Sequence, residues 1–199
     1  MLDVEVIEDP AAAAMAVDPV KSRLLAELTE PASAAALAGR LGIARQKINY
    51  HLRSLEDCGL VRVSTERLWG GLRERLMVAT AGSYVVSPAA LGPVAADPQR
   101  TRDRLSASYV IALAARIVRE VSTLMRRARQ ADKNLATLAI DTELRFKSAA
   151  DRAAFTNDLT KAVMSLVSRY HDAHAPGGRP HRLVIVAHPL PHEARTKEA

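Results

Sequence analysis

Cysteine and aromatic residues are scarce in this chain of 199 residues, which has one cysteine and an aromatic content of 4%. The single cysteine, Cys58, excludes an intramolecular disulfide and a zinc site built from several cysteines. No apolar run approaches the ~18 residues of a membrane span, and Met1–Glu5 carries acid where a signal peptide needs positive charge. We therefore expect a cytoplasmic protein, and its 48% hydrophobic and 25% charged residues are typical of a folded one.

Basic residues outnumber acidic ones by 28 to 22, and they gather in two blocks. Residues 40–75 hold eight basic and four acidic side chains, whereas residues 1–30 hold two basic and seven acidic ones. The second basic block, 100–133, has nine basic and three acidic residues. Most of these cations are arginines, whose forked guanidinium suits phosphate groups and guanine edges. The balance favours a polyanionic partner such as nucleic acid.

The first half of the chain carries a succession of helix signals and then a hairpin signal. The spacing of apolar residues predicts helices over 19–28, 34–41 and 44–58, followed by strands over 60–63 and 75–78. Caps agree with these bounds, since Asp18-Pro19 and Ser33 are typical helix starts and Gly59 is typical of a helix end. The sequence therefore predicts an α+β protein in which residues 17–87 form a winged helix-turn-helix domain. Residues 1–16 are predicted as a short strand followed by a loop or a fraying tail.

The third predicted helix has one apolar face and one polar face. Ile48, Leu52 and Leu55 recur at helical spacing and should anchor it to the core. The remaining face and the hairpin present side chains that can make forked or hydrogen-bonded contacts to base edges and phosphates. The candidate DNA-binding residues are Arg45, Gln46, Lys47, Asn49, Tyr50, Arg53, Arg67, Arg73 and Arg75. The alternative for this set is a solvated helix face and a solvated hairpin.

Residues 18–80 resemble the DNA-binding domain of the arsenic-repressor (ArsR) type of winged-helix regulators. The resemblance rests on the stretch from Ser33 to Val61, in which Leu55–Val61 reads Leu-Glu-Asp-Cys-Gly-Leu-Val and leads into the wing. It implies a bacterial transcriptional regulator, by default a repressor, that works as a homodimer on a near-palindromic operator. Metal-sensing members carry a cysteine pair in the helix that here spans 34–41, and this chain has none there.

The second half of the chain is longer than the resemblance accounts for. A linker over 88–99 precedes a long helix over 100–132, whose apolar stripe is the candidate dimer interface: Leu105, Tyr109, Leu113, Ile117, Val121 and Leu124. Residues 133–190 are predicted as a strand–helix–strand domain with strands over 138–146 and 183–187, and residues 191–199 as a disordered tail. Two strands are too few to stand alone. A further strand would come from residues 4–7, from residues 84–86 or from a second subunit.

Together these patterns predict a sequence-specific DNA-binding regulator, with the second half serving dimerisation and a small-molecule effector as a further candidate partner. Two alternatives stay open: a metal-responsive sensor that uses the C-terminal histidines, and a winged-helix module that binds protein. The histidines in question are His171, His174, His181, His188 and His192. Because Pro189 and Pro191 exclude a helix there, we expect no metal site. We also expect no cofactor and no enzymatic activity, since no nucleophile motif, phosphate loop or paired carboxylate site is present.

Overall fold

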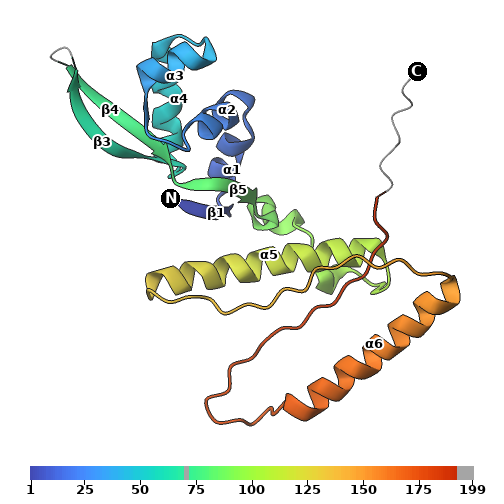
Figure 1. Ribbon diagram of the computed structural model, residues 1–199. Coiled ribbons are helices and arrows are strands. Elements are labelled where there is room, and N and C mark those ends of the chain that lie inside the picture. The colour runs from blue at the N-terminus through green and yellow to red at the C-terminus, as the bar shows by residue number, and fades with distance from the viewer. Residues whose placement is uncertain (70–71, 192–199) are drawn as a thin grey trace, which may run out of the picture. The chain divides into compact units, whose positions relative to one another are not determined.

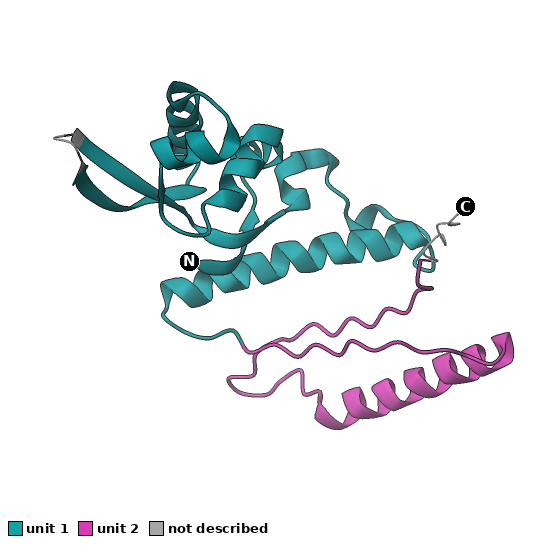
Figure 2. Ribbon diagram, turned by 45° about the horizontal axis from the view of Figure 1, so that its top comes forward, with its two compact units in different colours: residues 1–135 teal, residues 136–199 magenta. Residues whose placement is uncertain are grey.

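The computed structural model describes residues 1–69 and 72–191 (Figure 1). The chain divides into two compact units, Met1–Leu135 and Ala136–Ala199, which are described separately (Figure 2). Helices and strands are both present, as predicted, although the strands all lie in the first unit as far as the described residues go. None of the described helices has the length and apolar character that crossing a membrane requires.

The first unit holds all but one of the α-helices in the described residues. In chain order its elements are β1 (Leu2–Ile7), α1 (Pro10–Val17), α2 (Pro19–Glu27), β2 (Ala32–Ser33), α3 (Ala34–Leu41), α4 (Arg45–Asp57), β3 (Val61–Trp69), β4 (Leu72–Ala79), β5 (Ala81–Val86), the 3-10 turns η1 (Pro88–Val94) and η2 (Pro98–Arg100), and α5 (Ala107–Gln130). Figure 1 shows α2, α3 and α4 gathered beside the long β3–β4 hairpin.

The three helices α2, α3 and α4 form the predicted helix-turn-helix core. The Asp18 carboxylate accepts hydrogen bonds from the backbone at the start of α2, and the Ser33 hydroxyl does so at the start of α3. Gly42 ends α3 with a φ of 66°, a left-handed conformation that glycine adopts without steric cost. The apolar faces meet in a core whose most deeply buried members, all at 0% exposure, are Leu24, Leu28, Leu37, Ile48 and Leu55. The predicted helices and their buried faces are thus confirmed.

The wing is a three-stranded antiparallel sheet in the order β2-β4-β3. Strand β3 pairs with β4 from Val61↔Ala79 to Trp69↔Leu72, with a register shift between Val63 and Thr65. Each strand is longer than the sequence predicted. The prediction was too short because the residues beyond Val63 are largely polar or charged and lack the apolar alternation that indicates a strand. The predicted Gly70-Gly71 tip lies outside the described residues.

The N-terminal segment differs from the prediction. Strand β1 is confirmed, but it pairs in parallel with β5, from Leu2↔Ala81 to Ile7↔Val86. The alanine run after it forms α1, which is no loose tail because Asp9 caps it and Ala12 and Ala13 are buried in the core. Residues 81–86 form the strand β5, and the predicted linker of 88–99 is folded into the turns η1 and η2.

Helix α5 begins at Ala107, where the Ser106 hydroxyl accepts a hydrogen bond from the Tyr109 amide. Leu105 therefore precedes the helix, at 97% exposure, and its assignment to the helical stripe was wrong. The face that α5 buries within the unit is made of small residues, Ala112, Ala115 and Ser122.

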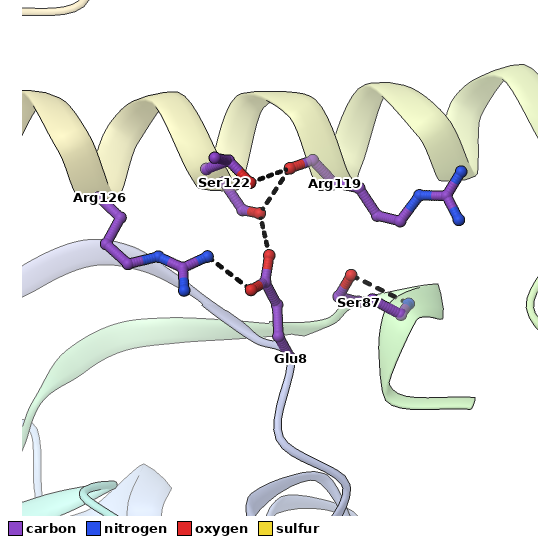
Figure 3. A network of polar contacts seen from close by, with 7 residues as sticks. Glu8, Ser87, Arg119, Ser122 and Arg126 are labelled. Atoms are coloured by element: carbon purple, nitrogen blue, oxygen red, sulfur yellow. Dashed lines mark hydrogen bonds and ion pairs between the residues drawn. The ribbon is translucent and has the colours of Figure 1, made fainter. Parts of the chain in front are cut away.

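A polar contact also anchors α5 to the end of β1 (Figure 3). The Ser122 hydroxyl and the Arg126 guanidinium each donate to the Glu8 carboxylate over 2.5 Å. The pKa of Glu8 is lowered, chiefly by the Ser122 hydrogen bond; burial opposes this shift, and the hydrogen bond and charge of Arg126 lower the pKa further.

The second unit contains α6 (Ala149–Tyr170), capped by the Ser148 hydroxyl, between two extended segments. The predicted helix is confirmed, whereas the predicted strands over 138–146 and 183–187 form no ladder within residues 136–191. A strand is defined by hydrogen bonds to a neighbouring edge, and periodicity alone cannot supply that edge. Apolar side chains in both segments stay exposed, among them Leu138, Ile140, Leu144, Leu183 and Ile185.

Candidate nucleic-acid interface

Helix α4 separates its side chains sharply into a buried and an exposed face. Ile48, Leu52 and Leu55 are at most 5% exposed and fix the helix on the core. The opposite face is entirely exposed and carries six of the nine predicted contact residues: Arg45, Gln46, Lys47, Asn49, Tyr50 and Arg53. The structure therefore places all six together on one accessible helix surface, with Tyr50 standing out at 67% exposure.

The N-terminus of α4 differs from that of every other α-helix in the described residues. Its N-cap is Ala44, which offers no side-chain hydrogen bond, whereas the other α-helices begin at an aspartate or a serine that caps them. The first amide groups of α4 are therefore left without a side-chain acceptor, at the end of the helix where its dipole is positive. This exposed end lies beside Arg45 and Lys47, so it favours an anion such as a backbone phosphate.

A cleft runs between α4 and strand β4 of the wing. It is lined from the helix by Arg45, Asn49, Leu52 and Arg53, from the wing by Arg73, Glu74, Arg75 and Met77, and by Ala34. A second depression, over the outer face of α4, is lined by Arg45, Gln46, Asn49, Tyr50 and Arg53. The four arginines and one glutamate of the first cleft give it a positive balance, which suits a polyanion.

The three wing arginines predicted to contact DNA are exposed, but each is paired with a glutamate that the sequence prediction did not include. Arg67 lies 2.8 Å from Glu74 directly across the hairpin, and Arg73 lies 3.7 Å from Glu66. Hydrogen bonds from Ser33 and then Arg67 lower the pKa of Glu74, which stays ionised beside the arginine. These pairs could be predicted only with the register of the hairpin, because it is the register that brings each arginine close to a glutamate on the other strand.

The third wing arginine, Arg75, joins the wing to α4. Its guanidinium lies 2.5 Å from the carboxylate of Glu56, in the last turn of the helix. Arg75 thus braces the hairpin against the helix. By contrast, Arg45, Lys47 and Arg53 form no ion pair with any acidic group of residues 1–69 and 72–191, so their charge is uncompensated by contact.

His51 packs on the inner side of α4. It is 8% exposed, and neither ring nitrogen has a hydrogen-bond partner. Burial lowers its pKa, and the nearby charge of Lys21 lowers it further. The imidazole is therefore neutral at pH 7 and acts as a packing group that cannot take up a proton without cost.

The predicted interface of α5 is only partly covered within the chain. Tyr109, Leu113 and Val121 are half-buried, while Ile117 and Leu124 are 37% and 46% exposed. This stripe lies on a different side of the helix from Ala112, Ala115 and Ser122, which the unit buries.

No group of three or more potential metal ligands gathers anywhere in the described ranges. His181 and His188 each bring Nδ1 within 2.9 Å of a nearby backbone carbonyl, and His192 lies outside those ranges. Cys58 packs half-buried against the core.

Comparison with known proteins agrees with this geometry. The helix-turn-helix domain family matches residues 17–64, which span α2, α3, α4 and the start of β3. No curated protein matches the chain. The match and the fold together show a helix-turn-helix domain over these residues, which is the domain type of DNA-binding transcription regulators and indicates DNA as the partner.

Proposed function

We propose that the chain is an ArsR-type bacterial repressor, acting in the cytoplasm as a homodimer on a near-palindromic operator. The observation that carries the proposal is the exposed polar face of α4, which adjoins an arginine-lined cleft and ends in an uncapped helix terminus. In this proposal Lys47 and Asn49 read base edges in the major groove, and Arg53 and Arg73 bind phosphates. The protein acts by binding rather than by catalysis.

In this proposal the two copies of the chain dimerise through α5 and are related by a two-fold axis. Two copies related by a two-fold axis can place their α4 helices about one DNA turn apart, ~34 Å. The half-exposed stripe around Leu113, Ile117 and Val121 supports this assignment, because such an apolar surface is costly to leave in water.

The decisive test of base reading is a mobility-shift titration after genomic binding-site mapping has supplied the operator. Replacing Lys47 and Asn49 by alanine should cost ~1–3 kcal/mol per lost base contact and flatten the preference among sites. A matched control with the same chemistry is the pair Asn157→Ala and Lys161→Ala, on the exposed surface of α6. Equal binding by both double variants would remove α4 from the proposal.

Phosphate contacts leave a different signature. Arg53→Ala should weaken binding to every DNA alike and make the plot of log K against log salt shallower by about one unit. A loss confined to the operator, with the salt slope unchanged, would reassign Arg53 to base reading.

The dimer is tested by sedimentation. Wild-type protein should be dimeric at micromolar concentration, and Ile117→Glu should yield monomers that bind operator poorly, since a charge in the interface is left unpaired. A monomeric wild type that binds operator tightly would overturn this part of the proposal.

An effector, if one binds the C-terminal half, acts only through different affinities for two states of the dimer. Binding must then change DNA affinity by the same factor by which DNA changes effector affinity. Thermal-shift screening of small apolar metabolites with and without operator measures this coupling. Stabilisation that leaves DNA affinity unchanged would assign the C-terminal half to dimerisation alone.

A further inference from the structure

The segment 138–147 of the second unit has the alternation of a strand and no strand partner within residues 136–191. Its even-numbered side chains include Leu138, Ile140 and Leu144, which are 86%, 84% and 53% exposed. An apolar strand face with free backbone groups is an edge prepared for pairing. The segment therefore needs a neighbouring strand with which to pair.

One contact shows where the even-numbered face is directed. The ring of Phe146 lies 5.3 Å from that of Phe155 in α6, centroid to centroid. Phe155 belongs to the half-buried stripe of α6 that continues through Leu159 and Val163. Phe146, at the end of the even face, is thus directed toward α6, and strand alternation places the odd-numbered side chains on the other face of the segment.

The odd face carries charge in an order that is complementary to itself. Asp141 and Glu143 come first, and Arg145 and Lys147 follow, all of them exposed. In an antiparallel pair of identical strands related by a two-fold axis, the acidic half of each strand lies opposite the basic half of the other. Opposite charges facing each other across a ladder stabilise it, whereas like charges destabilise it.

Among the registers with an axis near the middle of this charged stretch, only one sets each of the two acidic residues opposite a basic residue. Centring the axis on Leu144 sets Asp141 opposite Lys147 of the second copy and Glu143 opposite Arg145. A shift of one residue puts Glu143 or Arg145 against itself on the axis. A shift of two residues faces Asp141 with Glu143, or Arg145 with Lys147. Axes between residues would set apolar side chains against charged ones, because paired residues share a face.

We propose that residues 141–147 pair with the same residues of a second copy of this chain, antiparallel and with Leu144 on the two-fold axis. The pairing joins two C-terminal units into one sheet, with both α6 helices on its apolar side, and leaves the outer edges for the segments 183–187. This deepens the proposed homodimer by naming a second interface and its register. The pairing involves only residues of the second unit and does not involve DNA binding.

The register predicts a disulfide at one position. Across an antiparallel ladder, facing Cα atoms are ~4.5–5.5 Å apart, within the range that a disulfide spans. In a Cys58→Ala background, Leu144→Cys should give covalent dimers under mild oxidation of the full-length protein. Leu138→Cys is the matched control, since it is more exposed but lies far from its symmetry mate in this register. Circular dichroism and thermal unfolding confirm that each variant is folded.

Three outcomes of this experiment overturn the proposal. Absence of a Leu144→Cys dimer would show that the two segments do not meet. Equal dimer yields from both variants would indicate random collision, because Leu138 is the more accessible side chain. Efficient linkage through Ile140→Cys in place of Leu144→Cys would contradict the register.

A charge swap tests the same pairing with Cys58 in place. Glu143→Arg changes two symmetry-related pairs from attractive to repulsive and should weaken the dimer, measured by sedimentation, about tenfold. Adding Arg145→Glu restores opposite charges across the ladder and should restore the affinity. A double variant as weak as the single one would overturn the pairing. No DNA enters either experiment, so failure here is distinguishable from failure of operator binding, which is read from mobility shifts.

Discussion

The two units of this chain use similar apolar patterns to opposite effect. In residues 1–135, leucines on the apolar faces of helices are fully buried, among them Leu24 in α2, Leu37 in α3 and Leu55 in α4. In residues 136–191, the 22-residue helix α6 buries no side chain to the same degree, and the flanking segments leave Leu138 and Ile140 more than four-fifths exposed. An apolar stripe therefore specifies a core only where the same chain supplies the opposing surface.

Two helices show the same contrast at closer range. Helix α4 has no side-chain cap, yet the burial of Ile48, Leu52 and Leu55 holds it in place. Helix α6 begins with a serine cap, in which the Ser148 hydroxyl accepts from the Asp151 amide over 3.0 Å, but it has no comparable core to pack on. The first unit is thus stabilised by tertiary packing, and the helix of the second relies on local hydrogen bonds.

Substitutions of apolar residues in the two units should differ most strongly in how their cost in stability depends on protein concentration. Leu55→Ala should lower the free energy of unfolding by ~2–5 kcal/mol at any concentration, because the side chain is fully buried within one chain. Leu144→Ala should matter only where two copies meet, so its cost should appear as protein concentration rises. Denaturant unfolding at concentrations a hundredfold apart measures both. A concentration-independent cost at Leu144 would place that residue in a core of its own chain.

Local signals in the sequence were sufficient for the helix-turn-helix core and the wing. Asp18-Pro19, Ser33 and Gly59 each act on neighbouring residues, and the structure shows each of them at the helix end where it was expected. The exposed face of α4 follows from the same periodicity that predicts its buried face. Even α1 had a detectable signal, since Asp9-Pro10 repeats the Asp18-Pro19 start. This helix has only apolar residues, however, so it lacks the polar face that marks amphipathic helices.

Long-range partners were beyond such reasoning. Strand β1 pairs with β5 about 80 residues away, and no pattern in either segment names the other. The same holds for Glu8, whose partners Ser122 and Arg126 lie more than 100 positions along the chain. The segments 138–146 and 183–187 were predicted as strands from alternation that is real, but alternation does not provide a partner.

A substitution at Glu8 tests whether the contact of Glu8 with α5 stabilises the first unit. Glu8→Gln should lower the free energy of unfolding by about 1–2 kcal/mol at pH 7, because two charge-assisted hydrogen bonds are weakened. Since the folded-state pKa of Glu8 is lowered, the stabilisation is complete above the ordinary carboxyl pKa and is lost as pH falls through the lowered value.

Chemical denaturation at pH 7 and at pH 4 and below measures this effect. The gap between wild type and Glu8→Gln should narrow steadily with acidification. Glu120→Gln, also on α5, is a control for a charge change that leaves the Glu8 contact intact. A gap that is constant with pH would show that the ionised carboxylate is not the stabilising form.

His51 predicts a smaller effect, confined to the first unit. Its folded-state pKa is lowered, so the unfolded chain takes up the proton first as pH falls below the ordinary histidine value, and stability is lost through that range. His51→Leu removes the titration along with two unpartnered ring nitrogens, and should be neutral or stabilising at pH 7. Its free energy of unfolding should then fall less than that of wild type between pH 7 and 5.5, by at most about 1 kcal/mol. An equally steep fall in the variant would assign the acid sensitivity to another group.

Substitutions at the N-caps of α4 and α6 should have small effects, which test the contrast between these two helices. Ser148→Ala removes the cap of a helix that depends on local interactions, so it should reduce helicity by circular dichroism at a cost of ~1 kcal/mol. Ala44→Ser supplies the missing cap to α4 and should stabilise the first unit by ~0.5–1 kcal/mol. Because the added hydroxyl would occupy the amides that we assign to a phosphate, it should also weaken DNA binding slightly. Stabilisation without any loss of DNA affinity would show that the N-terminus of α4 is uncapped for a reason other than binding.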